Sequence, residues 1–211
     1  MSRDPVPLHP LRVVDAAPAR PGPTDRELVE AVLQGDVRVA AEIHDRLVSV
    51  IDQTLVRILG RRESDHEDLM QSSFEQVIRS LLQGGFLGAC SLRTWANRVT
   101  THVALNAIRS RQRERRVIQR DGSEVPESFG PVQESRAESE LEMARLREHL
   151  SAMSPATAEI LILHDLYGHG LSEIALLVGL SEAAAQSRLV RGRKELRERL
   201  RRDEAVKGAA P

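Results

Sequence analysis

Apolar residues recur at spacings of three and four along most of the chain between residues 24 and 202, which is the period of an amphipathic helix. Thr24 and Glu27 form a capping box, in which a hydroxyl and a carboxylate satisfy each other's backbone amides at the start of a helix. Asp36 can cap the next helix, which the pattern carries to Gly60. Its apolar positions are Ala40, Ile43, Leu47, Ile51 and Leu55.

Two more helices, each with one apolar face, are predicted between residues 64 and 116. Ser64 and Glu67 form a second capping box, and the helix behind it turns Met70, Phe74, Val77 and Leu81 inward. Ser91 can cap the following helix, whose inward positions are Leu92, Trp95, Val99 and Val103. Together, four helices with such stripes predict a compact antiparallel bundle.

The helical period is lost between residues 118 and 138, where glycine, proline and serine recur in a stretch longer than an ordinary loop. This stretch is predicted to be a flexible acidic linker. It separates a helical domain at residues 24–117 from a second one at residues 139–202, and residues 203–211 form a C-terminal tail. The expected fold class is therefore all-α, with two helical domains joined by a tether.

The second domain has the pattern of a helix-turn-helix. Ser154 and Pro155 start one helix, and Ser172 can cap another that runs through Val178. Gly179 to Ser181 form a three-residue turn, and Ser181 caps a long basic helix. A short helix, a turn containing glycine and a longer basic helix are typical of this DNA-binding motif.

Composition excludes several other classes of protein. Aromatic residues make up only 2% of the chain, which argues against β-rich folds and against RNA binders that stack bases on aromatic rings. Cys90 is the single cysteine, so an internal disulfide or a CxxC zinc site cannot form. No apolar run is long enough to cross a membrane. We expect a cytoplasmic protein without a metal, a cofactor or a membrane contact.

Residues 1–23 hold six of the ten prolines and no apolar core, which predicts a disordered tail and not a signal peptide. The net charge of −1 conceals blocks of opposite sign. Six arginines lie between residues 109 and 120, and eight basic residues lie between 188 and 202. The acidic linker lies between these two basic blocks.

The basic helix that follows Ser181 suits the major groove of DNA, which needs small or hydrogen-bonding side chains on the first turns and cations beside them. The alternative is an ordinary solvated surface helix, which the preceding helix and the glycine turn make less favoured. The candidate residues for base and phosphate contacts are Ser181, Glu182, Gln186, Ser187, Arg188, Val190, Arg191 and Lys194. Arg193 and Arg197 are further candidates for phosphate contacts.

The helix that follows Ser91 has a second polar face, whose amide, hydroxyl and guanidinium groups suit base edges and phosphates. Taken alone it could be an ordinary solvated face, but it continues into the arginine block. Its candidate residues are Arg93, Asn97, Arg98, Thr101, His102, Asn106, Arg109 and Arg113. The face formed by Asp65, Asp68, Gln71 and Glu75 is acidic and would repel DNA, so it is either solvated or docks a basic protein surface.

Three stretches resemble the sigma-70 family of bacterial RNA polymerase initiation factors, in particular the extracytoplasmic-function group that keeps only regions 2 and 4. Asp65 to Leu81 (DHEDLMQSSFEQVIRSL) resembles region 2.2, and Phe86 to Arg111, with its Thr94-Trp95 pair, resembles regions 2.3 and 2.4. Leu146 to Leu200 resembles region 4. The likeness covers residues 25 to 202.

This resemblance implies a role for each surface. The Asp65, Asp68 and Gln71 face would dock on the clamp helices of the polymerase β′ subunit, and the β flap of the polymerase is a further implied partner. The loop Gly88 to Leu92 and the helix after it would recognise and open the −10 promoter element, and the helix from Ser181 would read the −35 element. An anti-sigma protein is a further implied partner. One departure from the family pattern is Ala183 to Ala185, where a Thr-Val pair is usual.

Two other functions are consistent with parts of the sequence. A helix-turn-helix regulator that binds DNA without polymerase would explain the second domain and leave the first unexplained. A metal-dependent phosphohydrolase would use ligands such as His149, His164, Asp165 and His169, but these must gather in one pocket. No nucleotide-binding or nucleophile motif is present, so an enzyme is not predicted.

Overall fold

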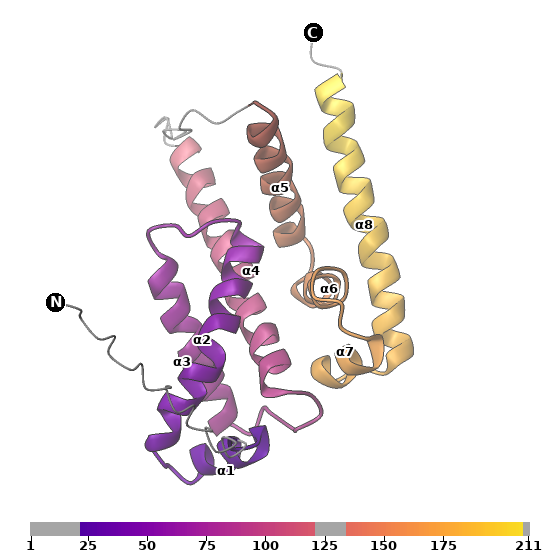
Figure 1. Ribbon diagram of the computed structural model, residues 1–211. Coiled ribbons are helices and arrows are strands. Elements are labelled where there is room, and N and C mark those ends of the chain that lie inside the picture. The colour runs from indigo at the N-terminus through magenta and orange to yellow at the C-terminus, as the bar shows by residue number, and fades with distance from the viewer. Residues whose placement is uncertain (1–21, 121–133, 209–211) are drawn as a thin grey trace, which may run out of the picture.

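The structure is a computed structural model that describes residues 22–120 and 134–208, and every regular element in these two ranges is a helix. The all-α fold class predicted from the sequence is confirmed. The predicted N-terminal tail and most of the predicted linker lie outside the described residues. In chain order the helices are α1 (Asp25–Leu33), α2 (Arg38–Leu59), α3 (His66–Leu82), α4 (Leu92–Arg120), α5 (Glu134–Ala152), α6 (Pro155–Leu161), the π-helical turn η1 (Ile162–Leu166), α7 (Leu171–Val178) and α8 (Glu182–Gly208) (Figure 1).

Four of the predicted helix caps are confirmed. The Thr24 hydroxyl accepts a hydrogen bond from the Glu27 amide, and the Glu27 carboxylate accepts one from the Thr24 amide, which completes the capping box of α1. Three serines also accept hydrogen bonds from backbone amides three residues later, at the starts of α4, α6 and α8. They are Ser91, Ser154 and Ser181.

Three predicted caps are wrong. The Asp36 carboxylate accepts a hydrogen bond from the Arg38 amide, but α2 begins after Val37 and has no side-chain cap. α3 begins after Asp65 and not after the predicted cap Ser64, and no side chain caps it. The Asp65 carboxylate instead accepts hydrogen bonds from Arg111 of α4. α7 begins two residues earlier than the sequence indicated, after Gly170, so Ser172 lies inside the helix. At α3, a tertiary contact thus engages the side chain that stands at the cap position.

Helices α1 to α4 enclose the first part of the core. α2 is its centre, with Ile43, Leu47, Ile51 and Leu55 fully buried, and Leu92 and Trp95 of α4 pack into the same interior. Burial of each such side chain stabilises the folded state by roughly 1.5–3 kcal/mol compared with leaving the side chain exposed. The burial of Trp95 agrees with its predicted inward position.

Helices α6 to α8 form the helix-turn-helix. Gly179, at the turn before α8, has a φ of 68°, a left-handed conformation that glycine adopts without a steric penalty. α6 and α8 approach closely at Gly192, where an added Cβ would lie 2.6 Å from Cγ2 of Thr157. The lack of a side chain at Gly192 lets α8 lie directly on α6.

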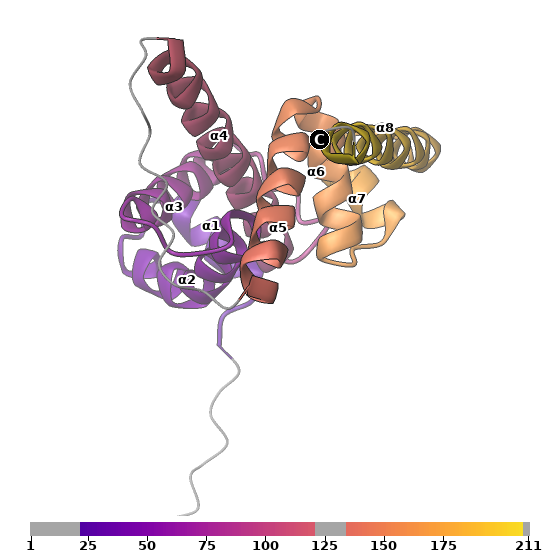
Figure 2. The same cartoon turned by 90° about the horizontal axis from the view of Figure 1, so that it is seen from above.

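The two halves of the chain share an interior. α5 and α6 pack on α4, and the buried apolar residues of both halves form one continuous cluster that includes Leu105 and Ile108 of α4 with Met153 and Ile160 of the second half. In both views α8 lies on the side of the molecule away from α1, α2 and α3 (Figure 1, Figure 2). This docking was not predicted from the sequence, where a tether joined two separate units.

Several helices extend past the boundaries that the sequence pattern indicated. α4 continues to Arg120, α5 begins at Glu134, and α8 continues to Gly208. The ends of the predicted linker and the start of the predicted C-terminal tail are therefore helical. Segments 121–133 and 209–211 lie outside the described residues.

Candidate nucleic-acid interface

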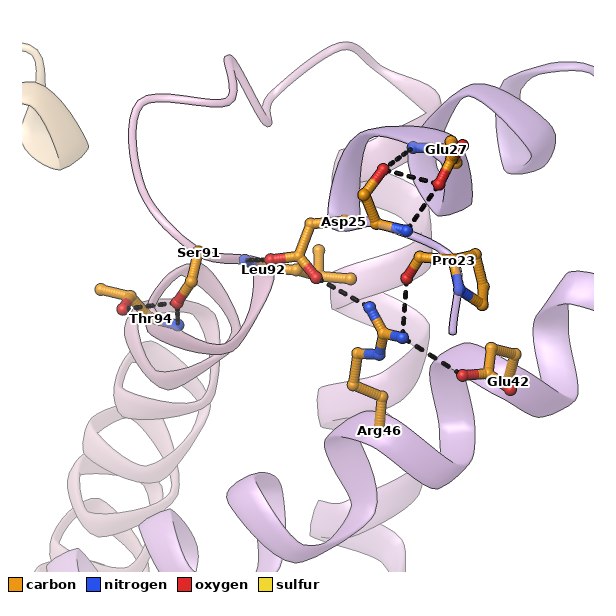
Figure 3. Close-up of polar contacts among 9 residues, drawn as sticks. Pro23, Asp25, Glu27, Glu42, Arg46, Ser91, Leu92 and Thr94 are labelled. Carbon is orange, nitrogen blue, oxygen red and sulfur yellow. Dashed lines mark hydrogen bonds and ion pairs between the residues drawn. The ribbon is translucent and has the colours of Figure 1, made fainter. Parts of the chain in front are cut away.

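The start of α4 is fixed by a carboxylate from α1 (Figure 3). Asp25 accepts a hydrogen bond from the Leu92 amide at 2.7 Å through one oxygen and from Arg46 of α2 at 3.0 Å through the other. Arg46 also donates to the Pro23 carbonyl and to Glu42. An anion at a helix N-terminus is favoured by the free amides and the helix dipole. Asp25 therefore holds α4 on the bundle formed by α1 and α2.

The polar face of α4 divides into three groups. Arg93, Asn106 and Arg113 are exposed. Asn97 accepts a hydrogen bond from the Thr54 hydroxyl at 2.7 Å, and the buried Thr101 hydroxyl donates to the Asn97 carbonyl. The structure thus turns Asn97 and Thr101 toward the bundle, while the first three candidates are open to solvent.

The third group is bound by the second half of the chain. Arg98 Nε donates to the Glu159 carboxylate at 2.6 Å, and His102 Nε2 lies 2.9 Å from the same carboxylate oxygen. Arg109 Nε donates to the Ser151 carbonyl at 2.9 Å. Arg98, His102 and Arg109 are therefore half-buried and contact groups of the second half.

Glu159 is the centre of this contact, with only 3% of its surface exposed. Burial alone would raise the pKa of its carboxyl group, but the hydrogen bonds and charges of His102 and Arg98 outweigh burial and hold the pKa below its usual value. The side chain is thus a buried carboxylate that is paired with Arg98 and lies beside His102 of α4.

The acidic face on α3 is mostly free. Asp68, Gln71 and Glu75 are exposed, and the Gln71 amide donates to Glu75 at 3.1 Å. Asp65 differs, because it accepts hydrogen bonds from Arg111 at 2.7 and 2.8 Å, which hold the pKa of Asp65 below its usual value. Three of the four predicted residues remain available to a partner.

The outer surface of α8 carries the other candidate set. Seven of its eight candidates are exposed and Arg188 is half-buried. Arg191 donates to the Ser187 carbonyl at 3.3 Å, and Lys194 lies 4.0 Å from Glu198. Arg193, which was expected near phosphate, pairs instead with Asp165. The exposed candidates are Ser181, Glu182, Gln186, Ser187, Val190, Arg191 and Lys194.

The histidines that suggested a metal site lie in separate pairs. His149 contacts Asp203, His164 contacts Asp165, and His169 contacts Glu173. Within the described ranges, no group of three or more histidine, cysteine or acidic side chains is placed to hold a metal ion. In the same ranges no helix is both long enough and apolar enough to cross a membrane.

The sequence pattern did not identify three residues that position these surfaces. Asp25 lies between Thr24 and Glu27 of the predicted capping box and was given no role, although its carboxylate anchors α4. Arg147 donates to the Ile58 carbonyl at 2.9 Å, and its guanidinium lies over Gly60. The burial of Glu159 could have been suspected from the sequence, because this acidic residue directly precedes the apolar run Ile160 to Leu163.

Cys90 lies in the loop before α4, and burial, with a smaller contribution from the charge of Glu173, raises the pKa of its thiol to about 11. Only the thiolate is alkylated, so we expect iodoacetamide to label Cys90 at pH 8 about a hundredfold more slowly in the folded protein than in the protein unfolded by urea. The rate should rise about tenfold per pH unit up to about pH 11. Mass spectrometry of the labelled protein measures this rate, and a plateau near pH 9 in the folded protein would contradict the assignment.

The exposed helix-turn-helix, together with a helical bundle that carries a basic helix, defines a class of DNA-binding transcription proteins. Family models match both halves: sigma-70 region 2 matches residues 44–114, and sigma-70 region 4 matches residues 143–196. The chain belongs to the sigma-70 family, in its extracytoplasmic-function group. The family consists of initiation factors of RNA polymerase and not of enzymes.

Relatives and solved structures with similar chains are also sigma factors. CarQ of Myxococcus xanthus is 30% identical over 135 residues, which are 64% of this chain and 74% of CarQ. SigE of Mycolicibacterium smegmatis is 32% identical over 150 residues, which are 67% of this chain. The chain spans only about half (54%) of the length of that relative. The solved structure of CnrH in complex with the cytosolic domain of CnrY is 23% identical, with a TM-score of 0.49 over 85% of this chain and 98% of that one.

Proposed function

We propose that this protein binds core RNA polymerase and directs promoter-specific transcription initiation, with the first half recognising and opening the −10 element and the second half reading the −35 element. The observation that carries the proposal is the match of regions 2 and 4, in that order, to the two halves that bear the candidate surfaces. α8 presents hydrogen-bonding residues on its first turns and cations on the next, as a helix in the major groove requires.

The remaining surfaces suit protein partners. The exposed Asp68, Gln71 and Glu75 on α3 form the face proposed to dock on the β′ clamp helices. The β flap is a further proposed contact on the polymerase. Acidic side chains favour a basic partner and increase the rate of association more than the final affinity. An anti-sigma protein is a further proposed partner, and no single residue of this chain identifies its binding site.

Run-off transcription tests the proposal. The purified protein is added to core polymerase of the source bacterium, with templates taken from upstream of the transcripts that increase when the protein is overproduced. We expect a discrete transcript only when both protein and core enzyme are present. Tight binding of duplex DNA by the protein alone, without any such transcript, would instead favour a regulator that acts independently of polymerase.

A further inference from the structure

The carboxylate of Asp25 joins three helices of the first half at one point (Figure 3). It accepts a hydrogen bond from the Leu92 amide at 2.7 Å and another from Arg46 Nη1 at 3.0 Å. Leu92 is the first residue of α4 and is fully buried, and Arg46 belongs to α2. Asp25 itself is the first residue of α1, so its side chain fixes the start of α4 from 67 residues away along the chain.

The neighbours of Asp25 hold this carboxylate in place. The capping box of Thr24 and Glu27 fixes the backbone at the start of α1. Arg46 has only 27% of its side chain exposed, and it also donates to the Pro23 carbonyl at 2.9 Å and to a glutamate on its own helix. A side chain that is already held by other partners loses little further conformational freedom when it contacts Asp25. The carboxylate is therefore preorganised to receive the amide of α4.

The loop between α3 and α4 ends at this contact. Its other fixed point is Phe86, whose ring meets the buried ring of Trp95 edge-on, with 5.7 Å between the ring centroids. Residues 87–89, between the two fixed points, are exposed. Trp95 belongs to α4, so the ring contact ties the loop to α4. The hydrogen bond between Leu92 and Asp25 ties both the loop and α4 to α1 and α2.

We propose that Asp25 is a positioning residue for the −10 element, which holds the loop before α4 where the loop meets the separated strand. This inference rests on the proposed function. It assigns a role to α1, which lies outside the segment that sigma-70 region 2 matches, residues 44–114. Groups that recognise a ligand must be held within roughly 0.5 Å of the productive position. Loss of the Asp25 contact thus impairs recognition without removing a group that touches DNA.

The first test measures how well polymerase carrying each variant discriminates between an intact −10 element and one with a substituted base pair. A single wrong base pair weakens recognition roughly tenfold or more. We expect Asp25→Ala to lower the ratio of run-off transcript from the two templates about fivefold, because the loop is no longer held. Binding of a −35 duplex should not change, since α8 lies on the side of the molecule away from α1 (Figure 1).

Asp36→Ala is the matched control. Asp36 also accepts hydrogen bonds from a backbone amide and an arginine near a helix start, and its side chain is 31% exposed, against 33% for Asp25. Its partner Arg38 is only two residues away, so loss of this contact leaves the loop before α4 held. Asp36→Ala should therefore keep the discrimination ratio of the unaltered protein.

The second test uses Cys90, which lies in the same loop two residues before Leu92. Iodoacetamide at pH 8 should label it about tenfold faster in Asp25→Ala than in the unaltered protein, because a freed loop exposes the half-buried thiol. Burial is the main cause of the raised pKa of this thiol, and charges, among them that of Asp25, contribute less.

Asp25→Asn separates the position of the loop from the charge. It removes the charge but keeps a side-chain oxygen, and asparagine caps a helix about as well as aspartate does. Asp25→Asn should therefore label more slowly than Asp25→Ala and should recover most of the discrimination at the −10 element.

Arg46→Met tests the positioning without altering Asp25. Loss of a cation alone weakens binding to every DNA sequence and leaves the discrimination between sequences unchanged. Loss of the contact with Asp25 instead lowers the discrimination ratio, as in Asp25→Ala. Arg26→Met is the control for an equal loss of charge, at an arginine of α1 whose side chain is 87% exposed.

The inference is overturned if Asp25→Ala matches Asp36→Ala in either the discrimination ratio or the labelling of Cys90. Equal labelling of Asp25→Ala and Asp25→Asn would also overturn it, because the charge would then explain the effect. Should Asp25→Ala fail to fold, the comparison of Arg46→Met with Arg26→Met decides the question. The unaltered protein is measured with core polymerase on the intact template in parallel. If it gives no transcript, the proposed function fails, while the labelling of Cys90 still decides whether Asp25 holds the loop.

Discussion

Leu47→Ala is expected to lower the free energy of unfolding by roughly 3–5 kcal/mol, which is a large part of the stability of a domain of this size. Leu47 lies at the centre of α2 with none of its surface exposed, among helices that meet in the shared interior. Truncation removes apolar contacts and leaves a cavity that rigid neighbouring helices fill only in part. Urea unfolding followed by circular dichroism measures the loss.

Leu87→Ala is the matched control, because it makes the same chemical change at a side chain that is 85% exposed. Its effect should stay within about 0.5 kcal/mol. A loss at Leu47 no larger than the loss at Leu87 would contradict the placement of α2 at the centre of the core.

The double change Arg191→Ala and Lys194→Ala is expected to weaken binding of a −35 duplex by roughly tenfold or more at physiological salt. Both side chains are exposed on the outer surface of α8, beyond the turns that would reach base edges. Each cation that neutralises one phosphate contributes about 0.9 to the slope of log K against log salt, so the slope should become shallower by about 1.8. Fluorescence anisotropy over a series of salt concentrations measures both quantities.

Arg201→Ala with Arg202→Ala is the corresponding control. These two arginines are also exposed on α8 but lie about ten residues further along, so the loss of charge is equal while the position differs. The slope should change less than it does for Arg191 and Lys194. Equal effects of the two pairs would show that α8 contributes only its overall charge.

Local pattern was enough to predict most of the helices, because each carries an apolar stripe and several carry their own cap. Thr24, Ser91, Ser154 and Ser181 accept the predicted hydrogen bonds, since each depends only on residues three positions away. The predicted cap at Ser64 is not formed: Asp65 stands at the cap position, and its carboxylate contacts Arg111, which is far along the chain. Local periodicity contains no information about such a contact.

Because the local pattern contains no information about long-range contacts, the contacts between the two halves at the candidate site were also not predicted. The spacing of Arg98, His102 and Arg109 correctly indicated polar positions on one helix, but not that α5 and α6 would contact them. The docking of the two halves depends on the match of their surfaces, through Glu159 and the apolar residues beside it. The exposed candidates on α8 could be predicted because nothing in the described part of the chain packs over that surface.

The position of α8 on the outer side of the molecule has a consequence for the order of events at a promoter. Its candidate −35 surface is exposed, while Arg98 and His102 of α4 contact Glu159 of the second half. Under the proposed function, the surface for the −35 element is therefore free to bind before the surface for the −10 element. Under the proposed function, the protein would first be captured by duplex DNA and would engage the separated strand in a later step. Initiation would then proceed in two separate binding steps, and a cell could regulate the second step without changing the first.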